Sequence, residues 1–517
     1  MSNPPRYAAI LLGTALALFL KACTLIPPNP DRPVTQVITP PTSSPLTQTA
    51  KTIQANGSRH QSHFLLVNSA SEAMKWRLAM IDSATGSIDI QTFLWANDHC
   101  GALIFNRLIQ AAKRGVRIRL LVDDIWLTAN DQNLSSLCQH PHINIRLYNP
   151  SRVRNSKFGQ AAYFLNNYRT MNRRMHNKTF IADGVMAIHG GRNVGNQYFG
   201  LAKTYNFRDL DVISTGPVLK QIKHEFDQFW NSPQAYPAEE LAHSPGLETI
   251  TEEIRELNQR VNKQGHDILS SYPTSRKDWS DRLTTLPSRM TPGSARFVSD
   301  IPDTDDNKTR IMVDELGKML NKAKKEIIVV SPYFIPYKQS LDGLREATAK
   351  GVKVKILVPS MGANNHTPAH SHYRKYRKRI LEAGAELYEY NFQPSEPQRS
   401  LCDVSPARAE WIGLHMKTMI ADRQHCYIGT LNLDPRAMNI NTEEGLIINS
   451  PALGKELASL IDEALLPENS WQLRLNDKGK IRWHGKEAEP LRRQPARSGM
   501  QRFIDAIARW VPIEKEL

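Results

Sequence analysis

Two segments of the chain carry the same polar residues at the same spacing. "HNKTFIADGVMAIHGGRN" runs from His176 to Asn193, and "HMKTMIADRQHCYIGTLN" runs from His415 to Asn432. Each begins with a histidine that is followed two residues later by a lysine, and an aspartate, a glycine and an asparagine follow at matched offsets. A lone His-x-Lys is usually a surface accident, but two matched copies within a larger repeat indicate catalysis.

The residue types in the two copies suit chemistry at a phosphate group. A lysine supplies a compact positive charge, and asparagine or hydroxyl side chains supply hydrogen-bond donors. One histidine can attack phosphorus while a second, in the opposite protonation state, protonates the leaving oxygen. Since each copy supplies one histidine beside its lysine, we predict that each copy is half of an active site formed across a pseudo-twofold interface.

The elements that must position these residues also occur twice. The strand-like runs "SIDIQTFLW" and "EIIVVSPYF" each precede a helical stretch that ends at a glycine, Gly115 or Gly351. An alternating strand follows in each case ("VRIRLLVDD" and "VKVKILVPS"), then a further strand, then the motif. His and Lys two residues apart share one face of a strand, and Asp183-Gly184 predicts a tight hairpin turn. The repeat predicts an α/β fold of two duplicated halves.

Composition bounds the class of protein and its partners. The chain has 517 residues, 40% hydrophobic content, a net charge of +15 and a pI near 9.5. The length and hydrophobic content predict a globular protein of several domains. The charge favours an anionic partner, for which nucleic acid and an anionic membrane are the two candidates.

The N-terminal residues predict export and membrane attachment. The apolar run Ala8–Leu20 is too short to span a bilayer comfortably and is typical of a secretory signal. "LKAC", which ends at Cys23, resembles a bacterial lipoprotein box, although Lys21 departs from that pattern; an uncleaved anchor or a signal cut elsewhere are the alternatives. The Pro-, Thr- and Ser-rich stretch that follows predicts an extended tether. We therefore expect a membrane-attached protein of a bacterial cell envelope that faces the periplasm.

Other candidate metal and redox residues give weaker signals. Cys100, Cys138, Cys402 and Cys426 form no C-x-x-C pair, which argues against a zinc site and leaves disulfides open. Three further histidines fall within seven residues in the second half, and a substrate loop or a surface position is favoured for them over a metal site. They are His366, His370 and His372.

The duplicated motif resembles the signature of the phospholipase D superfamily, H-x-K-x4-D-x6-G-[GS]-x-N. Gly190 and Gly191 match the first copy, and Gly429 and Thr430 the second. Gly191 stands in place of a hydroxyl residue, so that half lacks one donor. Longer stretches, including "GGRNVGNQYFG", "FRDLDVISTGP" and "LDPRAMNINTEEG", are similar to bacterial cardiolipin synthases of the C type, from about Ser62 to the C-terminus.

This resemblance implies a fold, a mechanism and a set of site residues. It implies two phospholipase D-like α/β/α halves with mixed sheets packed around a pseudo-twofold active site. It also implies a phosphohistidine on His176, with His415 as general acid and then base, Asp209 beside His415, and Glu443 beside His176. Asp211 and Glu444 lie close to these acids in sequence. No cofactor or metal is required. The implied catalytic residues are His176, Lys178, Asp183, His415, Lys417 and Asp422, and the phosphate-binding residues are Asn193, Asn432 and Thr430.

Asp183 and Asp422 are expected to shape the hairpins and hold neighbouring cations rather than to react.

The predicted boundaries are 1–22 for the signal or anchor, 23–60 for the tether, 61–235 for the first half, 236–300 for a connector, 301–470 for the second half, and 471–517 for a C-terminal tail. An amphipathic helix within this tail places Phe503, Ile507 and Trp510 on one face, which suits either a membrane interface or packing on the protein body.

The predicted substrate is an anionic phospholipid, and the predicted activity is cardiolipin synthesis with phosphatidylglycerol as acceptor and either phosphatidylglycerol or phosphatidylethanolamine as donor. Hydrolysis of phospholipids and an exported phosphodiesterase or nuclease are the alternatives, because basic residues interleaved with aromatic ones also suit single-stranded nucleic acid. A non-enzymatic phosphate-binding scaffold would require both histidines to be dispensable. The basic clusters are Arg152, Arg154, Lys157, Arg169, Arg173 and Arg174, and Arg374, Lys375, Arg377, Lys378 and Arg379.

Overall fold

The computed structural model describes residues 26, 30–55, 60–127, 131–154, 157–241, 252, 255, 256, 259, 266–272, 280–302 and 311–517. The predicted signal segment and the predicted lipidation site Cys23 lie outside these residues. Within them, no helix combines the length and the apolar character needed to cross a membrane.

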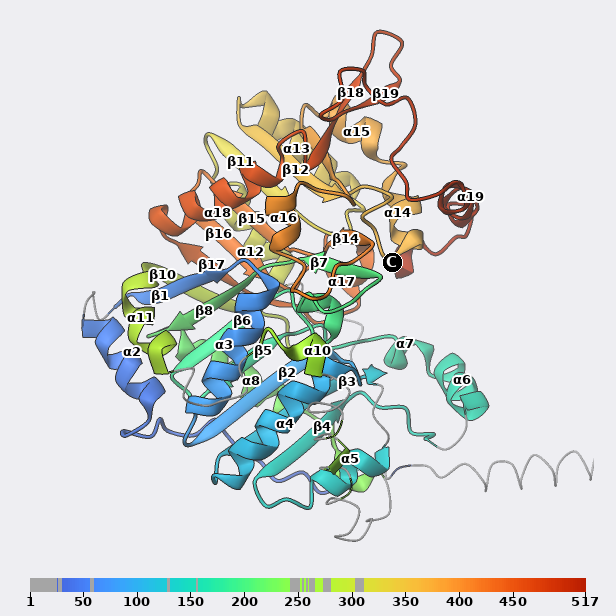
Figure 1. The fold of residues 1–517 in the computed structure, drawn as a ribbon. Coiled ribbons are helices and arrows are strands. Elements are labelled where there is room, and N and C mark those ends of the chain that lie inside the picture. The colour runs from blue at the N-terminus through green and yellow to red at the C-terminus, as the bar shows by residue number, and fades with distance from the viewer. Residues whose placement is uncertain are drawn as a thin grey trace, which may run out of the picture.

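One 17-stranded mixed sheet runs through both halves of the protein (Figure 1). In the first half the strand order is β9-β4-β3-β2-β5-β6-β8-β1, and in the second half it is β10-β17-β16-β15-β11-β12-β13-β18-β19. β1 and β10 pair antiparallel and join the two parts. The first-half strands are β1 (Ser62–Val67), β2 (Ser87–Trp95), β3 (Arg117–Leu127), β4 (Ile143–Tyr148), β5 (Thr179–Ala182), β6 (Met186–Gly190), β8 (Asp211–Thr215) and β9 (Ala235–Pro237).

The second half repeats this arrangement about the β1–β10 junction. β2, β3 and β4 are parallel neighbours, as are β11, β12 and β13, and an antiparallel motif hairpin follows on the other side of β2 and of β11. The predicted duplication is therefore confirmed. The second-half strands are β10 (Thr291–Ser299), β11 (Glu326–Val330), β12 (Lys353–Pro359), β13 (Glu386–Tyr390), β15 (Thr418–Ala421), β16 (His425–Gly429), β17 (Glu444–Asn449), β18 (Ser470–Leu475) and β19 (Ile481–His484).

Helices cover the faces of this sheet and bury its apolar side chains. Their bounds are α2 (Pro45–Ala55), α3 (Ala70–Ser83), α4 (His99–Lys113), α5 (Asp131–Leu137), α6 (Lys157–Asn166), α7 (Tyr168–Met171), α8 (Leu219–Trp230), α10 (His266–Leu269), α11 (Ser280–Arg289), α12 (Ile311–Leu320), α13 (Lys338–Ala349), α14 (Thr367–Tyr373), α15 (Arg377–Glu382), α16 (Glu396–Ser400), α17 (Pro435–Asn439), α18 (Pro451–Ala464) and α19 (Gly499–Ala508).

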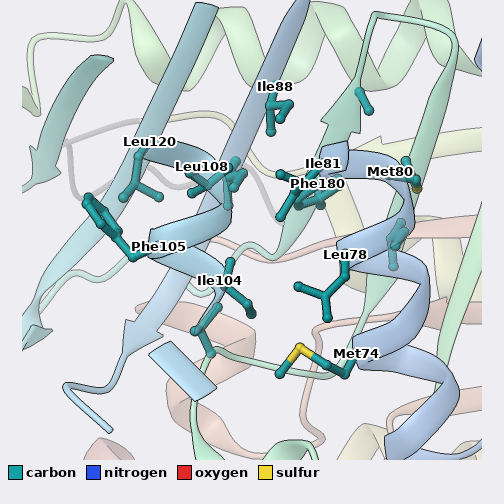
Figure 2. Packing of buried hydrophobic residues seen from close by; sticks show 14 of the residues in the cluster. Met74, Leu78, Met80, Ile81, Ile88, Ile104, Phe105, Leu108, Leu120 and Phe180 are labelled. Carbon is teal, nitrogen blue, oxygen red and sulfur yellow. The ribbon is translucent and has the colours of Figure 1, made fainter. Parts of the chain in front are cut away.

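The core of the first half shows why these helices form where they do. Ser69 and Asp98 cap α3 and α4 by accepting hydrogen bonds from backbone N–H groups in the first turn. Leu78 of α3 and Leu108 of α4 then pack toward the sheet in one apolar cluster (Figure 2). Burial of each such side chain contributes about 1.5–3 kcal/mol. After α4, Gly115 adopts φ 90°, and Gly351 adopts φ 82° at the equivalent position of the second half.

The predicted extended tether is wrong for residues 30–55, which pack on the first half. The backbone carbonyl oxygen of Thr35 accepts a hydrogen bond from buried Arg119, and the Thr35 hydroxyl accepts one from the indole of Trp230. The helix α2 buries Leu46 and Ile53 completely or nearly so. A segment poor in apolar residues is ordered here because buried polar side chains of the first half bind its main chain.

Two predicted boundaries also shift. The residues assigned to a connector include β10, which lies in the central sheet, and the residues assigned to the C-terminal tail include β18 and β19, which extend that sheet beyond β13. The four cysteines considered for disulfides are free thiols, and no group of three His, Cys, Asp or Glu side chains within the described part of the chain could hold a metal ion.

Candidate active site

Each motif is built on a hairpin whose tight turn is fixed by its aspartate. Asp183 and Gly184 both have positive φ (49° and 63°), as do Asp422 and Arg423 (54° and 53°). The Asp183 carboxylate accepts hydrogen bonds from the N–H groups of residues 85, 86 and 87, and Asp422 accepts them from residues 324, 325 and 326. Both carboxylates therefore bind main chain at the end of the hairpin away from the histidines, which corrects the expectation that they hold cations.

Short parallel pairings between the halves position the two histidines. Leu414 of β14 (Trp411–Leu414) pairs with Arg208 of β7 (Tyr205–Arg208), so His415 and Asp209 are the next residues on adjacent strands. In the same way, Met175 forms a parallel bridge with Thr442, and His176 and Glu443 follow directly. The N–H of His176 donates to the Thr442 carbonyl (3.0 Å). Adjacent parallel strands thus bring each histidine beside an acid of the opposite half.

The histidine–acid pairs are the ones predicted from the sequence. His176 Nδ1 lies 2.9 Å from Glu443 Oε2, and His415 Nδ1 lies 2.6 Å from Asp209 Oδ2. All four side chains are buried or nearly so. An Nδ1–H that donates to a carboxylate fixes the ring tautomer and leaves Nε2 available for chemistry. Burial would raise the pKa of Asp209, but His415 and Lys417 outweigh it and hold that pKa well below its usual value.

The two lysines line the same buried site. Nζ of Lys178 donates to the carbonyl oxygen of His176 (2.6 Å), and Nζ of Lys417 donates to that of His415 (2.7 Å). Burial, reinforced by Lys417 in the first case, lowers the pKa of Lys178 to about 7 and that of Lys417 to about 8. Two ammonium groups in one dry site repel each other. The empty site therefore favours an anion that can restore their charge.

The pKa values of the two histidines are lowered, as are those of the lysines. Burial and the nearby Lys417 lower the pKa of His415 to about 3, and burial and Lys178 lower that of His176 well below its usual value. Aromatic rings that the sequence did not single out surround them. Phe93 lies edge-on to His176 with 5.0 Å between ring centroids, and Tyr198 lies 5.2 Å from His415. Such apolar surroundings lower the local dielectric and so strengthen the electrostatic interactions within the site.

The three residues predicted to bind phosphate differ in the contacts that they make within the protein. The Thr430 hydroxyl donates to Glu443 (2.6 Å), so it orients the acid that holds His176. The side-chain NH2 of Asn193 donates to the Tyr198 hydroxyl, and its Oδ1 accepts from the N–H of Leu94. By contrast, Asn432 Oδ1 is buried with no hydrogen-bond partner in the structure. This oxygen can accept a hydrogen bond from a hydroxyl group of a ligand, whereas a phosphate oxygen would have to bind the N–H of the same amide.

The glycine that replaces a hydroxyl residue in the first copy has a steric cause. A Cβ on Gly191 would lie 2.2 Å from Asp209 Oδ1, closer than any real contact. The shorter acid of the first half therefore occupies the space that Thr430 fills beside Glu443 in the second half. The sequence shows one Gly–Asp pair and one Thr–Glu pair, but it does not show that the two residues of each pair lie in contact.

The neighbouring acids serve other contacts. Asp211 forms ion pairs with Arg77 (2.9 Å) and Arg192 (3.3 Å). Glu444 accepts hydrogen bonds from the N–H of Lys178 (2.5 Å) and the hydroxyl of Thr179 (2.8 Å). Neither is the acid that holds a motif histidine, and Glu444 instead supports the backbone beneath Lys178.

Several members of the predicted basic clusters are paired inside the protein. Arg154 binds Asp124, and Arg174 binds Asp123. In the second half Arg374 binds Asp505, and Arg377 binds Glu389. These four arginines therefore support the fold through ion pairs within the protein.

The three loop histidines are also occupied by other contacts. His370 binds Asp505 (2.6 Å), and His372 binds Glu514 (2.8 Å). His366 caps α14 by accepting from the N–H of Ala369 and lies against Tyr333. Their side chains therefore anchor α14 and the C-terminal tail.

Comparison with known proteins identifies the family. Residues 78–230 and 316–465 match the family described as "Cardiolipin synthase, PLD-like domain". The chain belongs to this family. As a member it is a phosphatidyltransferase of the phospholipase D superfamily, and the two matched segments correspond to the two structural halves.

Individual relatives agree with this assignment. Cardiolipin synthase C of Escherichia coli (strain K12) is 33% identical over 454 residues, which cover 86% of this chain and 93% of that protein. The major cardiolipin synthase ClsA of Bacillus subtilis (strain 168) is 25% identical over 75% of this chain and 66% of its own length. The crystal structure of phosphatidylserine synthase of Haemophilus influenzae Rd KW20 shares the fold, with a TM-score of 0.57, 14% identity, and coverage of 90% of this chain and 100% of that one.

Proposed function

We propose that the protein is a cardiolipin synthase that transfers a phosphatidyl group from a phospholipid donor to phosphatidylglycerol. The observation that carries this proposal is the pair of carboxylate-bound histidines, one from each half, in a buried site with two lysines. Two such histidines suit double displacement at phosphorus, in which one acts as nucleophile and the other moves protons. The family and its named relatives support a phospholipid as the substrate.

In the first step, Nε2 of His176 attacks the phosphorus of the donor. The P–O bond to the donor alcohol breaks, and the proton on Nε2 of His415 passes to the leaving oxygen. Lys178 and Lys417 balance the charge on the non-bridging oxygens, and the amide N–H of Asn432 can donate a hydrogen bond to one of them. His415 is neutral in the empty site, so it takes up its proton as the anionic phosphodiester arrives, with Asp209 stabilising the imidazolium.

In the second step, His415 removes the proton from a hydroxyl of phosphatidylglycerol. That oxygen attacks phosphorus, the P–N bond to His176 breaks, and cardiolipin leaves. Water in place of the acceptor alcohol would give phosphatidic acid, so the exclusion of water by Tyr198, Phe93 and the surrounding rings favours transfer over hydrolysis.

Mass spectrometry of lipids formed by the purified protein in vesicles of phosphatidylglycerol, with and without phosphatidylethanolamine, tests the activity and the donor. His176→Ala and His415→Ala should each abolish cardiolipin formation. With a p-nitrophenyl phosphatidyl ester, whose leaving group needs no acid, His415→Ala protein should accumulate an acid-labile phosphoprotein that His176→Ala protein does not form. An adduct on His415 would reverse the two roles, and histidine-dependent cutting of nucleic acid without action on phosphatidylglycerol would refute the proposal.

A further inference from the structure

The C-terminal helix α19 and the turn that follows it present a wide apolar face to solvent. Six large apolar residues between Met500 and Val511 are 43–75% exposed, and Trp510 is the most exposed of them. A face of this kind on a monomeric protein is a docking surface rather than a scatter of surface side chains. The residues are Met500, Phe503, Ile504, Ile507, Trp510 and Val511.

Within the stretch from Arg492 to Val511, the exposed charges are of one sign. The exposed ionisable residues between Arg492 and Val511 are five arginines, and the one acid of that stretch, Asp505, is fully buried against His370 and Arg374. An apolar face with tryptophan, flanked only by cations, matches the interface of an anionic bilayer. The five are Arg492, Arg493, Arg497, Arg502 and Arg509.

The helix is held firmly with this face outward. Asp505 on its inner side binds α14, and Gln501 donates to the carbonyl oxygen of Met361 (2.7 Å). The inner side therefore uses polar contacts, whereas core helices such as α3 and α4 turn apolar residues inward. Packing on the body, which was one of two explanations of the tail helix from sequence, does not account for its apolar residues.

A chain of cation–ring and ring–ring contacts links the segment just before α19 to the active site. The guanidinium of Arg497, just before α19, lies 3.7 Å from the centroid of the Trp411 ring, which stacks on Tyr205 (4.6 Å). Tyr205 contacts Phe207, whose ring is 4.8 Å from that of His415. A bilayer in contact with α19 would thus lie on the side of the protein from which these contacts lead to His415.

The first half contributes apolar residues on the same side of the molecule. In Figure 1, α6, α7 and α19 project on one side, and the C-terminus lies between α19 and α7. Phe158 and Leu165 of α6 are 72% and 73% exposed. Glu516, near the end of the chain, accepts hydrogen bonds from Tyr168 (2.6 Å) and Asn172 (2.9 Å) of the first half. Both halves therefore share this side.

We propose that α19, supported by α6, is the surface by which the protein docks on an anionic lipid bilayer so that substrate lipids enter the site from that side. This inference rests on the proposed phospholipid substrate, but docking itself does not require turnover. Replacement of Phe503, Ile507 and Trp510 by Ser should weaken partitioning of this surface by about a hundredfold or more, because each side chain gives up apolar burial in the lipid.

A fluorophore sensitive to polarity, attached at Ile504→Cys of the full chain, reports insertion at this site independently of any N-terminal attachment. Its emission should shift to the blue with vesicles of phosphatidylglycerol, much less with phosphatidylcholine, and equally in His415→Ala protein. A probe at Leu466→Cys, an exposed apolar position in the turn after α18, should not respond. Lack of a shift at position 504 in vesicle-bound protein would overturn docking, and a shift that depends on protein concentration without vesicles would show that a second copy covers the face.

Turnover separates this inference from the proposed function. The triple Ser variant should lose most activity on vesicles and retain activity on dispersed short-chain phosphatidylglycerol, whereas the matched control Val34→Ser/Ile301→Ser/Leu466→Ser should be unaffected on both. Equal loss on both substrates would show that α19 is structural. If the wild-type protein turned over neither lipid substrate, the proposed function would be refuted, whereas the insertion measurement would still test docking.

Discussion

The protein should take up protons when an anion binds in the predicted phosphate site. In the empty protein the pKa of Lys178 is about 7 and that of Lys417 about 8, against an ordinary value of 10.5, because burial penalises the ammonium form. A bound dianion between them favours that form and raises both pKa values. Above pH 7, therefore, binding must recharge lysines that the empty folded protein holds partly neutral.

The size of the effect follows from the two pKa values. Once the pH exceeds the pKa of a lysine in the empty site, each further unit reduces anion affinity about tenfold for that lysine. Between pH 7 and pH 9 both lysines pass this point, so the affinity for sulfate should fall about a hundredfold or more. Sulfate is the suitable probe because it stays a dianion throughout this range, whereas phosphate itself changes protonation near pH 7.

Isothermal titration calorimetry at constant ionic strength provides the measurement. Comparison of buffers with different ionisation enthalpies counts the protons taken up for each sulfate bound; near pH 8.5 the two lysines should take up about one to two protons and His415 up to about one more. Lys178→Gln and Lys417→Gln should each reduce both the uptake and the pH dependence. Lys350→Gln, at an exposed lysine that pairs with Glu346, is the matched control. Sulfate affinity that is independent of pH from 7 to 9, without proton uptake, would refute the account of the lysines.

Three further changes probe other parts of the structure. Thr430→Val removes the hydrogen bond to Glu443 and should lower turnover about tenfold, since bonds to charged groups contribute about 1.5–3 kcal/mol, while Thr430→Ser should restore it; unchanged turnover in steady-state lipid assays would place the hydroxyl outside the mechanism. Activity should survive EDTA, and loss that zinc reverses would require a metal role for the His366 loop. A chain that begins at residue 61 should have a free energy of unfolding in urea about 3 kcal/mol or more below that of a chain that begins at residue 30, because the burial of Leu46 and Ile53 is lost. Equal stabilities would show that this packing does not stabilise the fold.

The repeated elements could be predicted because their signals are local. Hydrophobic alternation, glycine after each helix and the turn at Asp183 each depend on a few neighbouring residues, and the same signals occur twice. The pairing of His176 with Glu443 was also predicted, although only through the family resemblance. No local pattern shows that Met175 and Thr442, which are far apart in the sequence, lie side by side.

What the sequence could not show depends on contacts between distant segments. Residues 30–55 have the composition of a disordered linker, yet Arg119, Arg146 and Asp227 of the first half bind their main chain. The strands β18 and β19 were missed because the sheet edge that they join is formed by β13, about 80 residues earlier in the chain. The contact between Thr430 and Glu443 was not predicted for a similar reason, since it forms within the protein and no local pattern indicates it.

The differences between the two halves give a physical reason for unequal histidines. A general acid must become an imidazolium, and the acid that holds it must stay ionised. His415 has the shorter contact with its carboxylate, 2.6 Å against 2.9 Å for His176, and Asp209 has a strongly lowered pKa. A nucleophile must stay neutral, and the carboxylate oxygen of Glu443 that faces His176 also accepts the hydroxyl of Thr430, which weakens its pull on a proton. In the proposed mechanism, the Gly191–Asp209 pair and the Thr430–Glu443 pair thus divide acid and nucleophile between two halves that the motif alone makes equivalent.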